Sequence, residues 1–200
     1  MESSRLQAFS DGVLAVIITI MVLELRVPHG SDWHALGGSA VGFLTYLLSF
    51  VYIGIYWNNH HHLFHLVDRV DGVVLWANLH LLFWLSLLPF STAWLDESAV
   101  ALVPTVVYGI NLLCAAVAYY LLQLALFRLP SVGQRLRLVL GRDLKGKLSP
   151  VLYLLGIGLA YLEPWLGQVP YVAVALMWLV PDRRVERFVE AQGPRGTVGG

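Results

Sequence analysis

The residue types best suited to chemistry lie in two clusters within the first third of the chain. Ser10 and Asp11 stand at the start of an apolar segment, and the histidines His60 to His62, with His65, follow a second one. An ionisable residue beside hydrocarbon is costly in free energy, so it normally faces protein or water and marks an ion path, a proton relay or a structural pair. Histidine titrates near neutral pH and also binds metals. These two clusters set the candidate chemistry of the chain.

Metal binding is the first chemistry to test against these residues. His61 and His65 are four residues apart and share one face of a helix, as a zinc pair would. No cysteine or suitably spaced carboxylate completes such a site, so the sequence predicts no metal and no resident cofactor. Asp11, the histidine cluster and Asn78 fall at similar depths of three successive apolar segments, which favours an internal hydrogen-bond network. A pH sensor built from the histidines stays open as an alternative.

Enzyme chemistry has no support in the sequence. It contains no phosphate-binding glycine loop and no nucleophile motif, and Glu24 and Glu163 show no pairing of carboxylates. The 13 basic and 13 acidic residues give zero net charge, which argues against nucleic acid as a partner. We therefore predict that the protein is not an enzyme and does not bind nucleic acid.

The apolar segments that position these residues predict a membrane protein. The chain has 58% apolar and 13% charged residues and a mean hydropathy of +0.68, whereas soluble domains have about 25% charged residues. A helix needs about 20 apolar residues to cross about 30 Å of hydrocarbon. We predict an all-α polytopic fold with six transmembrane helices: 6–25, 36–66, 73–94, 100–127, 148–163 and 169–181. They form one domain over residues 1–191, and the glycine-rich tail 192–200 is predicted to be disordered.

The distribution of charge predicts the orientation of these helices. With the N-terminus inside, 12 of the 13 basic residues fall on the cytoplasmic side and Arg26 alone falls outside, as the positive-inside rule expects. An odd number of helices would put the later basic loops on the wrong side. Both termini are therefore predicted to be cytoplasmic.

The helix predicted over 6–25 carries an apolar stripe. At about 100° per residue, one face collects the following side chains, from the cytoplasmic end outward: Phe9, Val13, Val16, Ile20 and Leu23. Asp11 lies five positions before Val16, about 140° around the helix, so a polar patch stands across from the stripe. From geometry alone the stripe can also face lipid or a neighbouring helix, with Asp11 in a structural pair. Thr19 can likewise bond its own helix backbone.

Motifs in the first half of the chain resemble the transmembrane protein 175 family, the endosomal and lysosomal potassium channels and their bacterial relatives. They are Arg5-x-x-x-Phe9-Ser10-Asp11-Gly12, Tyr56-Trp57-x-x-His60-His61-x-x-Phe64, Asn78 and Leu88-Pro89-Phe90-Ser91-Thr92. The first motif is quite specific, whereas the second half of the chain agrees only in helix count and hydropathy. The length is similar to that of bacterial members with a single six-helix repeat.

The resemblance implies a homotetramer whose first helices line a central pore, unlike the ordinary tetrameric potassium channel fold with its carbonyl filter. The implied constriction consists of three apolar rings: Val16, Ile20 and Leu23. Thr19 matches a position linked to selectivity in some bacterial relatives, and Phe9 and Val13 belong to the same lining. Val16 is smaller than the Leu or Ile of many relatives, so tight closure at this ring is in doubt. The resemblance also implies a structural polar network: Arg5, Ser10, Asp11, His60, His61 and Asn78.

The function implied is a potassium-permeable, weakly selective cation channel, with proton permeation as a linked prediction. Its expected partners are further copies of the chain, the lipid bilayer and permeant monovalent cations such as K⁺, in a bacterial plasma membrane. One alternative is a secondary transporter or proton-coupled carrier that uses Asp11 and the His60–His62 cluster as a relay. Such a carrier would show slow, saturable flux. A non-conducting scaffold or enzyme subunit is the third reading.

Overall fold

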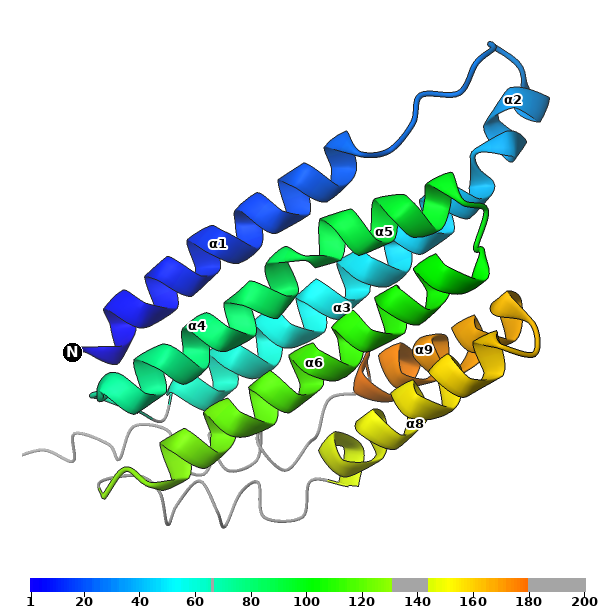
Figure 1. Cartoon of the computed structure of the whole chain (residues 1–200). Helices are drawn as coiled ribbons and strands as arrows, with labels where there is room; N and C mark the ends of the chain where they lie inside the picture. Colours follow the sequence, from blue (N-terminus) through cyan, green and yellow to red (C-terminus); the bar gives the residue numbers. More distant parts are fainter. Residues whose placement is uncertain (66, 131–143, 180–200) are drawn as a thin grey trace, which may run out of the picture.

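The computed structural model describes residues 1–65, 67–130 and 144–179, and these residues form an all-α structure (Figure 1). The described part contains eight helices: α1 (Ser3–Leu23), α2 (Trp33–Gly38), α3 (Ala40–His65), α4 (Gly72–Ser86), α5 (Leu88–Glu97), α6 (Leu102–Phe127), α8 (Leu144–Ala160) and α9 (Pro164–Leu179). The predicted all-α class is confirmed. The predicted tail, 192–200, lies outside the described residues.

Four stretches of the described chain are long and apolar enough to cross a membrane: α1, α3, α4 with α5, and α6. The third stretch runs over Gly72–Glu97 and counts 26 residues although it is interrupted once. Helices α8 and α9 have 17 and 16 residues, so each rises about 25 Å, slightly less than the hydrocarbon thickness.

The helices lie side by side as an elongated bundle with α1 along one edge (Figure 1). Helix α1 packs on α3, α4 and α5, whereas α6 packs on α4, α5 and α8. Helices α8 and α9 form a hairpin on the opposite side of the bundle from α1 (Figure 1). The first helix therefore packs on one side only in this single chain.

Two segments predicted as continuous helices are divided in the structure. The segment 36–66 contains the end of α2, a break at Ser39, and then α3. Its break follows Gly37 and Gly38, which lower helix stability. The segment 73–94 divides at Leu87 into α4 and α5. Here Pro89 lacks an N–H, and its ring clashes with the carbonyl one turn earlier.

The start of α1 is held by backbone hydrogen bonds to the connection between α3 and α4. The Ser3 N–H donates to Asp68 O at 3.0 Å, and the Val70 N–H donates to Met1 O at 3.0 Å. Asp71 then caps α4 by accepting from the Val74 N–H at 2.9 Å. These bonds fix where the first motif begins relative to α3 and α4.

Buried tyrosines join α3, α6, α8 and α9. The Tyr52 hydroxyl donates to Tyr171 O at 2.6 Å, and the Tyr108 and Tyr171 ring centroids are 5.9 Å apart. A Cβ on Gly109 or Gly156 would overlap the Tyr171 ring or its hydroxyl. The glycines thus allow close helix approach, as small residues do in membrane bundles.

Candidate functional site

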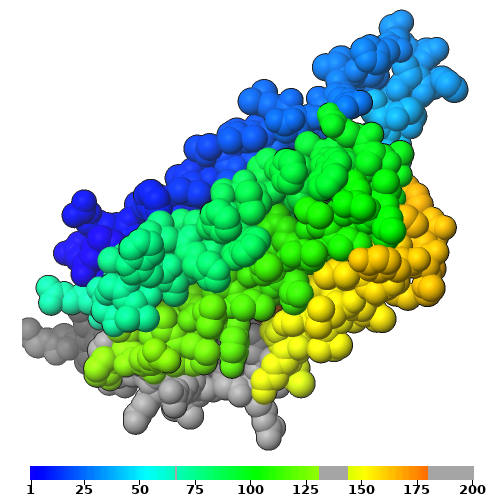
Figure 2. All heavy atoms as spheres, in the orientation of Figure 1, coloured from blue at the N-terminus to red at the C-terminus, as the bar shows by residue number. Residues whose placement is uncertain are grey.

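Helix α1 has two faces of opposite character. Leu14, Ile17 and Met21 are each at most 3% exposed and pack into the bundle. The apolar stripe faces away from the bundle, since Val16 is 55% exposed and Leu23 is 81% exposed. Figure 2 shows α1, in blue, as a ridge along one edge of the molecule. Within the stripe Val13 packs partly against the core, whereas Val16, Ile20 and Leu23 are left largely exposed by the described residues.

The exposed stripe forms one wall of a groove of about 1210 Å³. Val16 and Ile20 contribute to this wall, with Phe9 and Val13 further toward the N-terminus of α1. The facing wall is formed largely by α5 side chains: Phe90, Ala93 and Trp94. Four of the five stripe residues thus line one apolar groove, while Leu23 lies beyond it at the end of α1.

Thr19 lies on the exposed side of α1 between the stripe residues. Its hydroxyl donates to Val16 O at 2.8 Å, within its own helix. The hydroxyl oxygen keeps a lone pair that faces away from this bond. Thr19 therefore combines a local structural bond with an accessible acceptor.

A buried polar chain connects α1, α4 and α3. The Asn78 Nδ2 group donates to Ser10 Oγ at 3.0 Å, and Asn78 Oδ1 lies 2.8 Å from His60 Nε2. Since a carbonyl oxygen only accepts, His60 must carry a proton on Nε2. Ser10 in turn donates to Leu6 O at 2.9 Å. Ser10 and Asn78 are fully buried and His60 is 2% exposed, so this chain joins three helices away from solvent.

The other three residues of the predicted network lie outside this buried chain. Asp11 is exposed, and its Oδ1 accepts from the Trp57 indole N–H at 3.0 Å. His61 is exposed and stacks on Trp57 and His65, with ring centroids 6.2 and 6.1 Å apart. No side-chain hydrogen bond or ion pair joins Arg5 to another described residue. The step of about 100° per residue turns Asp11 away from its buried neighbour Ser10.

Trp57 is the functional-site residue that the sequence reasoning passed over. It belongs to the Tyr56-Trp57 motif, but nothing in the sequence pairs its indole with Asp11. Histidine stacking also explains the His61–His65 spacing without a metal. Among the described residues, no three His, Cys, Asp or Glu side chains gather closely enough to hold a metal ion.

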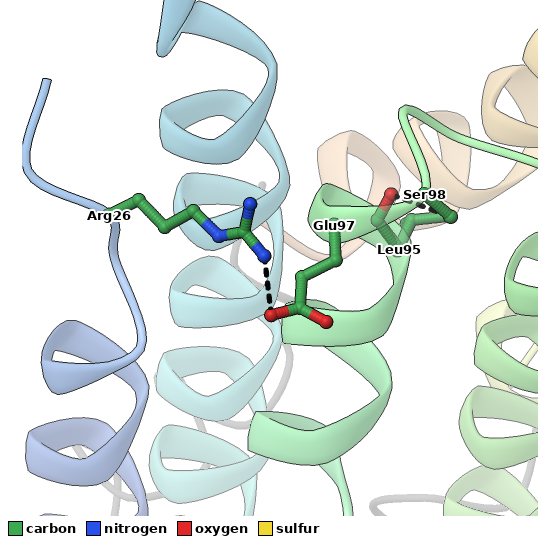
Figure 3. Close-up of polar contacts among 4 residues, drawn as sticks. All are labelled: Arg26, Leu95, Glu97 and Ser98. Carbon is green, nitrogen blue, oxygen red and sulfur yellow. Dashed lines mark hydrogen bonds and ion pairs between the residues drawn. The ribbon is translucent and has the colours of Figure 1, made fainter. Parts of the chain in front are cut away.

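An ion pair links the end of α1 to the end of α5. Arg26 follows α1, and its Nη2 lies 2.6 Å from Glu97 Oε1 on the last residue of α5 (Figure 3). Glu97 raises the pKa of Arg26 by hydrogen bonding and by its charge. Both side chains are more than half exposed, so the pair contributes little stability in water. It nevertheless marks where the two helix ends meet.

Comparisons with known proteins identify the family. The model of the endosomal/lysosomal potassium channel TMEM175 matches residues 5–89. A potassium channel of a Chryseobacterium species is 49% identical over 190 residues, which cover 95% of this chain and 99% of the relative. The chain belongs to the TMEM175 family. The membership predicted from the motifs is therefore confirmed.

Further TMEM175 relatives support the same assignment. A potassium channel of Chamaesiphon minutus is 34% identical over 182 residues, covering 83% of this chain and 88% of the relative. The crystal structure of a lysosomal potassium-selective channel TMEM175 homolog from Chamaesiphon minutus matches with a TM-score of 0.73 at 29% identity. That match covers 91% of this chain and 97% of the homolog.

Animal TMEM175 proteins match over a shorter region. The endosomal/lysosomal proton channel TMEM175 of Danio rerio is 30% identical over 121 residues, which cover 58% of this chain and 22% of that protein. The family thus includes relatives described as potassium channels and as proton channels. It is a family of membrane ion channels and not of enzymes.

Proposed function

We propose that this TMEM175 chain forms a homotetrameric, potassium-permeable, weakly selective cation channel in which four copies of α1 surround the pore. The observation that carries the proposal is the asymmetry of α1, with one packed face and an opposite face on which Val16, Ile20 and Leu23 are exposed in the described chain. Val16, Ile20 and Leu23 would then face the axis and form three rings. Membership of a channel family supports an axial role for this face over simple lipid contact.

The rings would control permeation through the wetting of a narrow apolar passage. Hydrophobic constrictions stop ions because a hydrated ion cannot cross a passage that excludes water. Val16 is the smallest of the three ring residues, so the ring it forms would be the most easily wetted. Leu23 is larger and lies at the far end of α1. We therefore assign the tightest closure to the Ile20 and Leu23 rings.

Weak selectivity follows from the few polar atoms on this path. Thr19 offers one hydroxyl oxygen per subunit, and its donated bond to Val16 O directs that oxygen's free lone pair away from the helix. A single hydroxyl layer replaces little of an ion's hydration shell, so discrimination between K⁺ and Na⁺ would be modest. Phe9 and Val13 would line the path toward the cytoplasm. Protons would follow the same path once it is hydrated.

The proposed topology has six membrane spans and two cytoplasmic termini. The four long stretches supply four spans, and α8 and α9 would add two short or tilted ones. The positive-inside distribution supports this arrangement in a bacterial plasma membrane. Residues 1–191 would then act as one channel domain.

Flux through purified protein in liposomes tests the proposal. We expect passive K⁺ flux, smaller Na⁺ flux, and an acid-driven H⁺ flux, all rising linearly with the gradient. Leu23→Ala should increase the flux, whereas Leu154→Ala, at an exposed α8 position, should leave it unchanged. Saturable, stoichiometrically coupled transport would favour the carrier, and flux that is unaffected by Leu23→Ala would contradict the constriction.

Cysteine accessibility tests the axis directly. In a Cys114→Ser background, Leu23→Cys should react with a membrane-impermeant thiol reagent that then blocks K⁺ flux. It should also form disulfide-linked pairs between subunits, because ring residues meet at the axis. Leu154→Cys is the matched control and should do neither. Equal behaviour at the two positions would mean that the stripe faces lipid.

A further inference from the structure

The interruption between α4 and α5 leaves two backbone groups that need partners. In a continuous helix the Leu88 N–H would donate to Trp84 O, four residues earlier. The break at Pro89 separates them, and within the described backbone Trp84 O accepts the closer Leu87 N–H instead, at 3.3 Å. Unpaired backbone groups are especially costly inside a membrane, where water cannot replace the lost bond.

One side chain, Asn111 of α6, gives both of these groups a hydrogen-bond partner. With its amide oriented to satisfy its neighbours, Nδ2 donates to Trp84 O at 2.8 Å and Oδ1 accepts from the Leu88 N–H at 3.3 Å. The same Oδ1 also accepts from Ser91 Oγ at 3.1 Å. In the opposite amide orientation only Nδ2 has a partner, Ser91 Oγ, and Oδ1 faces other acceptors. The orientation in which Nδ2 donates to Trp84 O is therefore the one that satisfies the surrounding groups. The Asn111 side chain is buried, at 4% exposed.

The helix beyond the break is the one that faces the apolar stripe. Phe90 and Trp94 of α5 form the wall opposite Val16 and Ile20. On its other side α5 is held by a second buried polar contact, since Thr92 Oγ1 lies 2.7 Å from Ser49 Oγ on α3. The direction in which α5 leaves the break therefore sets how it meets α1.

We propose that Asn111 is a positioning residue that bridges the Pro89 break and so holds α5, and through it the constriction face of α1, in place. The amide pairs the Leu88 N–H and Trp84 O, which the break at Pro89 keeps from bonding to each other. The role in conduction rests on the proposed function, but the bridge itself does not. Asparagine in the middle of a long apolar helix is otherwise an expensive choice.

A double-mutant cycle tests the bridge without any need for conduction. The variants are Asn111→Leu, Pro89→Ala and both together, and the measurement is the temperature at which the detergent-solubilised oligomer loses its elution peak. Asn111→Leu should lower this temperature by several degrees. In the Pro89→Ala background the same substitution should lower it by less than half as much, because Leu88 and Trp84 can then pair with each other. Additive effects would overturn the proposal.

A matched control on α6 distinguishes loss of the bridge from the effect of removing any buried polar side chain from this helix. Thr105 is buried, and its hydroxyl oxygen has no hydrogen-bond partner among the described residues. Thr105→Val should therefore show no coupling to Pro89→Ala. If Asn111→Leu fails to assemble, recovery of assembly by adding Pro89→Ala supports the bridge, and failure to recover overturns it.

Flux measurements test the positioning of α1. K⁺ flux per assembled Asn111→Leu oligomer should change at least twofold, and Pro89→Ala should bring it back toward the original value. If the two substitutions are coupled in the thermal cycle but the flux does not change, the bridge is supported and its effect on the position of α1 is overturned. Absence of flux in the unsubstituted protein would instead refute the proposed function, and the thermal cycle would still decide on the bridge.

Discussion

The Trp57 indole N–H donates to the Asp11 carboxylate across the contact between α3 and α1, at 3.0 Å. The two residues come from separate motifs that are 46 positions apart. The bond lies at an exposed position, beside the buried chain formed by Ser10, Asn78 and His60. The Asp11 carboxylate thus tethers α1 to α3.

Removing the indole donor should weaken this tether. Trp57→Phe keeps an aromatic ring for stacking on His61 but leaves Asp11 without its donor. We expect a loss of about 1 kcal/mol, the value for an ordinary hydrogen bond, because water screens the charge at this exposed site. The thermal midpoint of the solubilised oligomer checks this. Trp76→Phe, at an exposed α4 position, is the control, and an equal shift there would contradict the tether.

Helical periodicity made the apolar stripe predictable. The angle between successive residues is fixed by the backbone, so Val16, Ile20 and Leu23 had to share a face wherever the helix packed. The structure describes all three as exposed on that face. Which surface covers them depends on other copies of the chain, so the assignment to a pore stays a prediction.

Contacts between helices were predictable only where residue types and depths agreed. Depth grouped Asp11, the histidine cluster and Asn78, and the family resemblance added Ser10. Ser10, His60 and Asn78 form one buried chain, whereas Asp11 lies outside it. The partners of Asn111 could not be predicted from the sequence, because they are backbone groups at the break between α4 and α5. Neither the break nor the packing of α6 beside it is encoded in local periodicity. A polar amide within the apolar run 102–127 was the available signal.

Truncating Asn78 should damage the buried chain more than truncating Trp57 damages the tether. Asn78→Ala leaves the His60 N–H and the Ser10 hydroxyl without their shared partner inside the bundle. Buried unpaired groups cost about 1–3 kcal/mol each, so we expect a clear loss of assembled oligomer. Size-exclusion yield and thermal midpoint measure it. A yield equal to that of Leu79→Ala, at an exposed α4 position, would show that the chain is dispensable.

Breaking the ion pair at the end of α1 should have a small and salt-dependent effect. Glu97 raises the already high pKa of Arg26 by hydrogen bonding and by its charge, so Arg26 stays protonated across the physiological range. Arg26→Gln should lower the thermal midpoint only slightly, because both side chains are exposed to water. Comparing midpoints at low and high salt checks the assignment, because added salt screens exposed charges. A large loss that persists at high salt would point to a packing role for Arg26.

Introducing a polar side chain into the stripe should open the proposed constriction while sparing assembly. Leu23→Asn or Val16→Asn places an amide on the unpacked face of α1, where no described neighbour has to move. Water would then enter the passage more readily, and single-channel conductance or open probability should rise at least severalfold. Planar-bilayer recording measures this, with Leu154→Asn as a control on an exposed position of α8. Since Val16 is the smaller ring residue, Leu23→Asn should have the larger effect. Equal currents in all three variants would mean that the stripe is not the barrier to ions.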